Sequence, residues 1–337
     1  METHRIIRVR SLCSALAFII SMLVCPGGGT AVLQAQTPAA GPVSRAPKDA
    51  ATVARPDEPG QEPIPADHYD PDDTKTFADV LTEDRQVTIR GHQLTIHFYR
   101  PRSDGSAVPA IYACGDGGWR GLAPRTAEQL AHVGLAVAGI DSKVYLREFS
   151  SVADPLTIAR LASDYAEIAE ALRQYAKVEA QTPVYVYGWS LGAGFAVAVG
   201  SDPGTRAEWS GIISIGLPAQ NQLASGLGAN HADLRNPANA RYGFRTETLI
   251  RALSPVPLVM IQSTSDTASP QRVGKALFSA ALDPKQYVLI KATNHRFSGA
   301  RDEFYAALAN AAAWIKQARS SADPAQVTAR QNLRGAP

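Results

Sequence analysis

Short apolar runs recur along the middle of the chain. Within each run, consecutive positions are apolar rather than alternating with polar ones. Runs of this kind are typical of strands buried on both faces, as in a parallel sheet that helices cover on both sides. The pattern predicts strands at Leu94–Tyr99, Val108–Ala113, Leu135–Ile140, Val184–Tyr187, Gly211–Ile215, Leu258–Ile261 and Tyr287–Ile290.

Segments with helical spacing separate these runs. Between residues 158 and 175 the apolar positions step by three and four, which lines one face of a long helix. A last helix is expected from about Ala300 to Ala318, with Phe304, Leu308 and Ile315 on its buried face. We interpret the tyrosines of the longer stripe as core residues. Alternating strands and helices predict a doubly wound α/β sheet, built as one domain over residues 76–320.

The N-terminus has the pattern of a signal peptide over residues 1–35. Three arginines precede the apolar run Leu12–Val24, and small residues follow, with cleavage expected after Ala35. The run is shorter than the roughly 20 residues that span a bilayer, so we expect export to the periplasm rather than a membrane anchor. Lipid anchoring at Cys25 is a minor alternative, because Val24 stands where a small residue is expected.

Composition separates a tether and a tail from the domain. Residues 36–75 are rich in proline and alanine and lack apolar periodicity, so we expect a disordered tether, and residues 321–337 form a similar tail. The chain of 337 residues has 33 basic and 31 acidic side chains, and residues 1–35 hold three and one of these. The remainder carries no net charge, which argues against a nucleic-acid partner. Only Cys114 lies outside the leader, so no internal disulfide is expected.

A GxSxG motif follows the predicted strand Val184–Tyr187. Gly188, Ser190 and Gly192 provide its fixed positions, and a segment of small and apolar residues suited to a helix comes next. Strand before and helix after is the context of a nucleophile elbow, in which glycines permit the sharp turn that exposes the serine Oγ. The motif therefore predicts an α/β-hydrolase fold, a mostly parallel sheet with Ser190 as the nucleophile. The alternative is a tight turn in an ordinary βα unit.

Two later residues complete a triad in the chain order that this architecture uses. His295 follows the strand Tyr287–Ile290 and is the candidate base, and Asp266 ends the segment Leu258–Thr264, where the orienting acid belongs. The alternative for Asp266 is a turn residue ahead of Pro270. A serine, a base and an acid need no metal or organic cofactor for this chemistry, so none is expected.

A glycine-rich loop, Cys114–Trp119, follows the strand Val108–Ala113. Backbone N–H groups of Asp116 or Gly117, together with that of Leu191, are the candidates for an oxyanion hole. A carboxylate at Asp116 would oppose a developing negative charge unless it points away or is paired. We therefore weigh two roles for it, recognition of a substrate cation and a simple turn cap.

Four segments resemble the VirJ/AcvB family of bacterial virulence proteins, which are periplasmic α/β-hydrolases. They are CGDGGW at 114–119, GIDSKVY at 139–145, GWSLGA at 188–193 and NHRF at 294–297. The resemblance implies hydrolysis of aminoacylated phosphatidylglycerol, typically the lysyl ester. It assigns the triad roles to the three residues already identified. It also makes Asp116 and Asp141 candidates for the lysyl ammonium, and Trp119 and Trp189 candidates for substrate contact. For Asp141 a helix cap is the alternative.

Residues 219–253 are polar and rich in glycine and asparagine, and we expect them to form a lid or a substrate-recognition element. The leading hypothesis is hydrolysis of the aminoacyl ester of phosphatidylglycerol, with lysine as the acyl group, at a membrane surface. One alternative is a general exported esterase or acyltransferase that acts on a lipid or small ester. The other is a non-catalytic partner of a secretion apparatus or lipid surface that keeps the hydrolase fold.

Overall fold

The structure is a computed structural model that describes residues 76–103, 105–227 and 233–322. The expected signal peptide, the tether and residues 323–337 of the expected tail lie outside the described residues. The strands are β1 (Val80–Ile89), β2 (His92–Pro101), β3 (Val108–Ala113), β4 (Leu135–Ile140), β5 (Val184–Trp189), β6 (Trp209–Ile215), β7 (Gln220–Gln222), β8 (Gly243–Arg245), β9 (Leu258–Ser263) and β10 (Lys285–Ile290). The α-helices are α1 (Leu122–His132), α2 (Ser142–Phe149), α3 (Ile158–Ala176), α4 (Leu191–Ser201), α5 (Thr246–Leu249), α6 (Gln271–Ala280) and α7 (Arg301–Ala322), with 3-10 turns at Arg206–Glu208, Pro237–Tyr242 and Ile250–Leu253.

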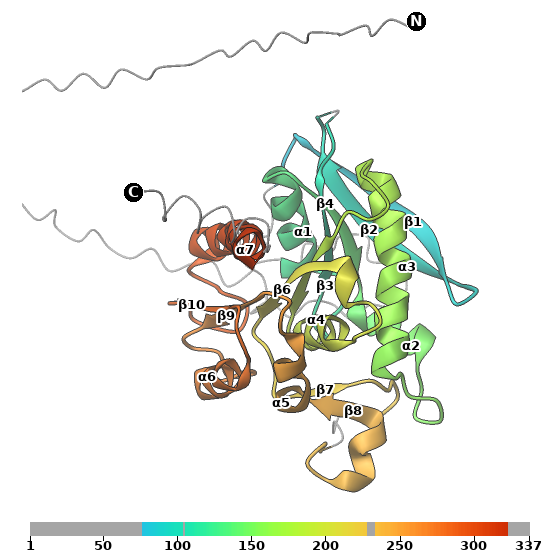
Figure 1. Ribbon diagram of the computed structural model, residues 1–337, viewed down its shortest axis with the longest axis vertical. Coiled ribbons are helices and arrows are strands. Elements are labelled where there is room, and N and C mark those ends of the chain that lie inside the picture. Colours follow the sequence, from blue (N-terminus) through green and yellow to red (C-terminus); the bar gives the residue numbers. More distant parts are fainter. Residues whose placement is uncertain (1–75, 104, 228–232, 323–337) are drawn as a thin grey trace, which may run out of the picture. The chain divides into compact units, whose positions relative to one another are not determined.

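Eight strands form one sheet in the order β1-β2-β4-β3-β5-β6-β9-β10 (Figure 1). β1 pairs antiparallel with β2, and β2 antiparallel with β4, whereas every later pair is parallel. All seven strands expected from the apolar runs belong to this sheet. The prediction of a doubly wound, mostly parallel sheet is confirmed.

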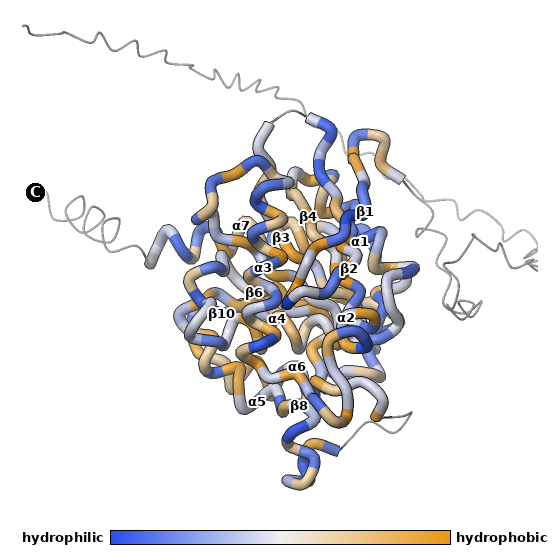
Figure 2. Tube along the Cα trace, turned by 90° about the vertical axis from the view of Figure 1, so that its right-hand side faces the viewer, coloured by the Kyte–Doolittle hydropathy of each residue, from blue (hydrophilic) through white to orange (hydrophobic). Residues whose placement is uncertain are grey.

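Helices cover both faces of the sheet. α1 and α7 pack on one face around an apolar cluster that includes Leu130 and Phe304. α3, α4 and α6 cover the other face around a second cluster, to which Tyr165 and Tyr175 of the helical stripe contribute. Hydrophobic segments accordingly gather inside the molecule (Figure 2). The interpretation of these tyrosines as core residues is confirmed, since both are buried.

The apolar pattern did not predict β1. Most of its side chains are exposed, because it is an edge strand with one neighbour, so it lacks the continuous apolar run of the inner strands. A tight turn joins it to β2, and the two turn residues Arg90 and Gly91 have φ of 49° and 80°. Two positive φ angles in succession are what a two-residue hairpin turn requires.

The strand order brings two loops together at one edge of the sheet. From β3 the chain continues to β4 on one side, and it returns to β5 on the other side of β3. The loops after β3 and β5 therefore flank the point where the order reverses, which is the usual place for a site in an open α/β sheet. A hydrogen bond from the Gly192 N–H to the Cys114 carbonyl, at 3.1 Å, joins the two loops.

Residues 219–253 form an excursion between β6 and β9 that contains β7, β8 and α5. The backbone of Leu156 donates to Leu223, and Ser225 donates to the Ser150 hydroxyl, so the excursion is tied to the segment after α2. Asn221 is buried against Gly194 of α4. Within the described part of the chain, no helix has the length and apolar character needed to cross a membrane.

Candidate active site

Ser190 lies at the junction of β5 and α4 with φ 55° and ψ −115°, which is strained for a residue with a side chain. The flanking glycines make the turn sterically feasible. A Cβ added to Gly188 would lie 2.0 Å from the Gly192 carbonyl oxygen, and one added to Gly192 would lie 2.2 Å from the Ala113 carbonyl oxygen. The Ser190 N–H donates to the Ile215 carbonyl at 2.9 Å, which fixes the turn to β6. This is the geometry of a nucleophile elbow.

Replacing Gly192 with alanine is expected to lower the free energy of unfolding by about 1–3 kcal/mol, because the new methyl would overlap backbone atoms that cannot move aside. Thermal unfolding followed by circular dichroism measures this. Gly105→Ala is the matched control, since a Cβ at Gly105 meets nothing within 4 Å and should leave the midpoint nearly unchanged. Equal midpoints for the two variants would contradict the tight contact between α4 and β3.

Asp266 and His295 form the second part of the site. The His295 Nδ1 lies 2.6 Å from Asp266 Oδ2, and the Asp266 side chain is fully buried. The other ring nitrogen, Nε2, is buried and has no hydrogen-bond partner among the described residues. An imidazole held at Nδ1 by a carboxylate, with Nε2 free, has the orientation of a general base.

The imidazole lies beside the elbow. A Cβ added to Gly216, the residue after Ile215, would come within 2.6 Å of the His295 Cε1, so the ring rests on the segment that also binds the Ser190 N–H. The Trp189 indole N–H donates to the His295 carbonyl at 3.3 Å, and the two ring centroids are 5.4 Å apart. Among the described residues, Ser190 Oγ and His295 Nε2 form no hydrogen bond. Such contacts are often long without substrate.

The expected oxyanion donors lie around Ser190. A Cβ added to Gly115 would be 3.2 Å from the Ser190 Cβ, which places the loop after β3 directly against Ser190. Within the described part of the chain, the N–H groups of Asp116, Gly117 and Leu191 show no hydrogen bond. Leu191 opens α4, where free amides and the helix dipole both favour a negative charge. Asp116 and Gly117 are exposed.

Asp141 has a structural role in this arrangement. It is the N-cap of α2, and its Oδ1 accepts from the N–H groups of Lys143 and Val144 at 2.9 and 3.1 Å. Its Oδ2 accepts from the Trp119 N–H at 3.0 Å. The helix-cap alternative accounts for these contacts, and both carboxylate oxygens are engaged in holding the loop to α2. We therefore carry Asp116, and not Asp141, forward as the candidate for a substrate ammonium.

The two tryptophans assigned to substrate contact are engaged by the protein. Trp119 stacks on His97, with ring centroids 4.7 Å apart and planes at 8°, and its ring fills the space above Gly139. Trp189 is buried and holds the His295 loop. Both residues therefore support the site from within the fold, and their contact with substrate stays a prediction.

Cys114 lies in the loop that contacts Ser190, and its thiol is buried. Burial, together with the neighbouring Asp141 charge, raises the pKa of its thiol far above the ordinary value. A thiol that stays protonated at neutral pH is a weak nucleophile. Among the described residues, no group of histidine, cysteine, aspartate and glutamate side chains is arranged to hold a metal ion.

Sequence reasoning missed the residues that hold Asp266. Its Oδ1 accepts from the Ser269 N–H at 2.7 Å, and its Oδ2 accepts from the Gln262 Nε2 at 3.0 Å. Gln262 ends the apolar run of β9 while the strand is still buried. A buried polar residue four positions before a candidate acid is a signal that could have identified it. Gly216 gave no comparable signal.

Solved structures show which fold this is. Est1E from Butyrivibrio proteoclasticus superposes with a TM-score of 0.52 at 13% identity, covering 70% of this chain and 99% of the other. A dienelactone hydrolase from Anabaena variabilis gives a TM-score of 0.50 at 18% identity, with coverages of 71% and 98%. The esterase Est22 gives 0.51 at 17% identity, with coverages of 71% and 82%. At these identities the likeness shows the α/β-hydrolase fold alone.

Sequence comparison identifies a family for part of the chain. Residues 107–204 match the family described as bacterial virulence protein (VirJ), a range that includes the loop after β3 and the Ser190 elbow but ends before Asp266 and His295. No curated protein matches the chain. The expected resemblance is confirmed over that range. The chain thus has an α/β-hydrolase fold, and its residues 107–204 match the VirJ family of bacterial virulence proteins.

Proposed function

We propose that this protein is a serine hydrolase of carboxylic esters, with Ser190 as nucleophile, His295 as general base and Asp266 as orienting acid. One observation carries the proposal. A histidine bound to a buried carboxylate at 2.6 Å presents a buried, unpartnered Nε2 beside a serine in a strained elbow. An unpaired buried nitrogen and a strained backbone both oppose stability, and their coincidence at one place favours a catalytic role.

In the proposed reaction, Ser190 Oγ attacks the ester carbonyl carbon while its proton passes to His295 Nε2. The carbonyl oxygen becomes an oxyanion that accepts hydrogen bonds from the Leu191 N–H and from the Asp116 or Gly117 N–H. Collapse of this intermediate breaks the ester bond, and the leaving alcohol takes the proton from Nε2. A water molecule then attacks the acyl-serine in the same way, which releases the acid and restores Ser190.

The substrate that we propose is the aminoacyl ester of phosphatidylglycerol, with lysine as the acyl group. The resemblance to the VirJ/AcvB family implies this lipid ester, and residues 107–204 match the family described as bacterial virulence protein (VirJ). The exposed carboxylate of Asp116 follows Gly115, where an added Cβ would lie 3.2 Å from the Ser190 Cβ, and it supports an acyl group with an amine. A periplasmic location and contact with a membrane surface follow from the expected leader and from this substrate, and belong to the same proposal.

Release of free lysine from lysyl-phosphatidylglycerol in mixed micelles tests the substrate. We expect release by the wild-type protein and none by Ser190→Ala. Asp116→Asn should lower kcat/KM for this lipid about fivefold, as expected for a partly solvated ion pair worth about 1 kcal/mol. The same variant should leave hydrolysis of p-nitrophenyl acetate, which has no amine, unchanged. Equal losses on both substrates would contradict ammonium recognition by Asp116.

A fluorophosphonate probe separates this proposal from the alternatives. A general esterase would be labelled at Ser190 and would hydrolyse p-nitrophenyl acetate but release no lysine from the lipid. In that case the excursion at 219–253 becomes the place to search for specificity, because it packs on α4. A non-catalytic partner of a secretion apparatus or lipid surface would not be labelled in its folded state.

A further inference from the structure

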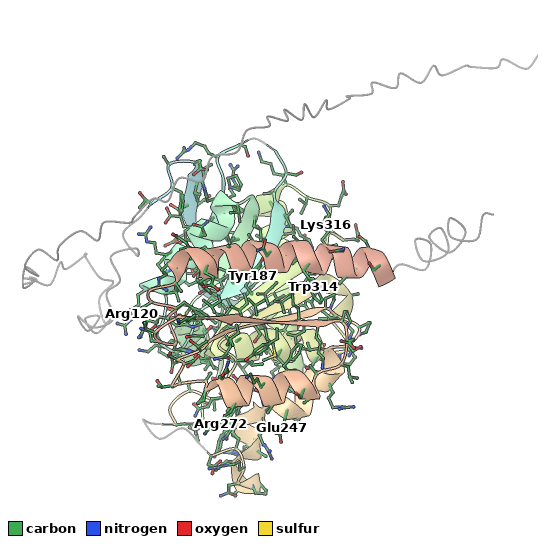
Figure 3. All side chains as sticks on the ribbon, turned by 90° about the vertical axis from the view of Figure 1, so that its left-hand side faces the viewer. Arg120, Tyr187, Glu247, Arg272, Trp314 and Lys316 are labelled. Atoms are coloured by element: carbon green, nitrogen blue, oxygen red, sulfur yellow. The ribbon has the colours of Figure 1, made fainter. Side chains whose placement is uncertain are left out.

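Gln262 is a buried amide in the middle of the fold. Gln262 is 1% exposed, and the β9 residues before it, Leu258–Ile261, are all apolar. The side chain lies on the face that α6 covers, since a Cβ added to Gly274 of α6 would be 2.9 Å from the Gln262 Oε1. Figure 3 shows α6, which carries Arg272, along the edge formed by β9 and β10. Burying a carboxamide is unfavourable unless its polar atoms are used, so its partners indicate its role.

The Gln262 amide binds the acid of the triad. Its Nε2 donates to Asp266 Oδ2 at 3.0 Å and to the Ser269 carbonyl at 2.7 Å. Oδ2 is also the oxygen that lies 2.6 Å from the His295 Nδ1. The other oxygen of Asp266 accepts from the Ser269 N–H. The carboxylate therefore has three donors, and two of them converge on the oxygen that faces the base.

We propose that Gln262 is a positioning residue, a fourth member of the series Ser190, His295 and Asp266. It touches neither substrate nor the reacting atoms. Its N–H holds Oδ2 in line with the imidazole Nδ1 and stabilises the negative charge of a carboxylate that is removed from water, where an unpaired charge is strongly disfavoured. This inference rests on the proposed function, because it assigns a role within the same triad.

The alternative role is purely structural, in which Gln262 closes the turn after β9 by binding the Ser269 carbonyl. Two substitutions distinguish the roles. Gln262→Met keeps the length of the side chain and removes the donor. Gln262→Glu keeps the shape and supplies a donor only while the new carboxyl is protonated. Tyr287, whose hydroxyl also approaches the Cβ position of Gly274, stays neutral over the useful pH range because burial raises its pKa.

For Gln262→Met we expect kcat for p-nitrophenyl acetate to fall about 10-fold to 100-fold with KM within about twofold of wild type, the loss expected for one hydrogen bond to a charged group. For Gln262→Glu we expect activity near wild type at acid pH, where the introduced O–H donates to Asp266. The activity should fall as pH rises, because a carboxyl beside a carboxylate ionises late and then repels it. Wild type lacks this descending limb.

Gln286→Met on the neighbouring strand β10 is the matched control and should leave kcat and the pH profile unchanged. The variants are compared as the purified, folded protein, with thermal unfolding recorded for each. Proton NMR of the His295 Nδ1–H, identified by its loss in His295→Gln, provides a readout that does not need turnover. We expect this far-downfield resonance to shift in Gln262→Met and to stay in place in Gln286→Met.

Wild-type kinetics and an unmoved resonance in both Gln262 variants would overturn the positioning role. A lower unfolding midpoint with no change in pH profile or resonance would overturn it as well, in favour of the structural role. If the wild-type protein hydrolyses no ester and takes no fluorophosphonate label, the proposed function fails. A resonance that still shifts in Gln262→Met would then support the contact between Gln262 and the Asp266–His295 pair on its own.

Discussion

Ser190→Ala is expected to lower kcat for ester hydrolysis about 10⁶-fold, to the rate that binding and the oxyanion donors sustain without a nucleophile. The elbow places Ser190 at the start of α4, against Gly115 of the loop after β3 and bound through its N–H to Ile215, the residue before Gly216, on which His295 packs. Loss of Oγ therefore removes the acyl-enzyme route altogether. Initial rates with p-nitrophenyl acetate, together with fluorophosphonate labelling followed by mass spectrometry, measure the effect.

Ser201→Ala is the matched control for this substitution. Ser201 is the last residue of α4, it is buried, and its hydroxyl donates to the Ala198 carbonyl at 2.8 Å. We expect it to keep wild-type kcat and full labelling. Residual labelling of Ser190→Ala at the wild-type rate would show that a different residue is the nucleophile, and the proposed mechanism would have to be abandoned.

Asp266→Asn is expected to lower kcat about 10⁴-fold with little change in KM. The carboxamide nearly matches the carboxylate in shape, but it presents an N–H or a weaker acceptor to the His295 Nδ1. The imidazole then favours the tautomer with its proton on Nε2, which cannot accept the serine proton. Gln262 aggravates the effect, because its Nε2 also requires an acceptor at this position.

The control for this variant is Asp283→Asn, which makes the same change on an exposed turn ahead of β10. It should keep wild-type kinetics. Thermal unfolding shows whether Asp266→Asn remains folded. Comparing kcat of the variant with that of the wild type at one pH, where both are native, then isolates the effect of the imidazole tautomer. An Asp266→Asn variant with more than about a tenth of wild-type kcat would exclude Asp266 as the orienting acid.

Several features of the site could be predicted because they depend on local sequence. The glycines at 188 and 192 are needed wherever a serine stands on a turn between strand and helix, and the structure shows the backbone contacts that exclude any Cβ there. Asp266 and His295 could be selected because each follows a strand late in the chain. The parallel pairing of β9 and β10 brings the ends of both strands to one edge of the sheet. There the His295 Nδ1 lies 2.6 Å from the Asp266 Oδ2.

Other features could not be predicted because they depend on contacts across the fold. The Trp119 ring packs on His97 of β2, a contact that no local pattern encodes, and its contact with substrate stays a prediction. Asp141 could be read as a ligand or a cap, and only the positions of the α2 N–H groups and of the Trp119 N–H decide for the cap. The edge strand β1 escaped detection because one neighbour and an exposed surface leave no continuous apolar run.

By itself the sequence determined the class of sheet, the position of the elbow and the order of the three candidate triad residues. These depend on the period of apolar residues and on the steric demands of one turn, both of which are short-range. Only the tertiary structure decided which side chains surround the triad. These contacts include the donors to Asp266, the packing of His295 on Gly216 and the anchoring of residues 219–253. They form where segments distant in sequence become neighbours, and the period of apolar residues does not specify which residues then meet.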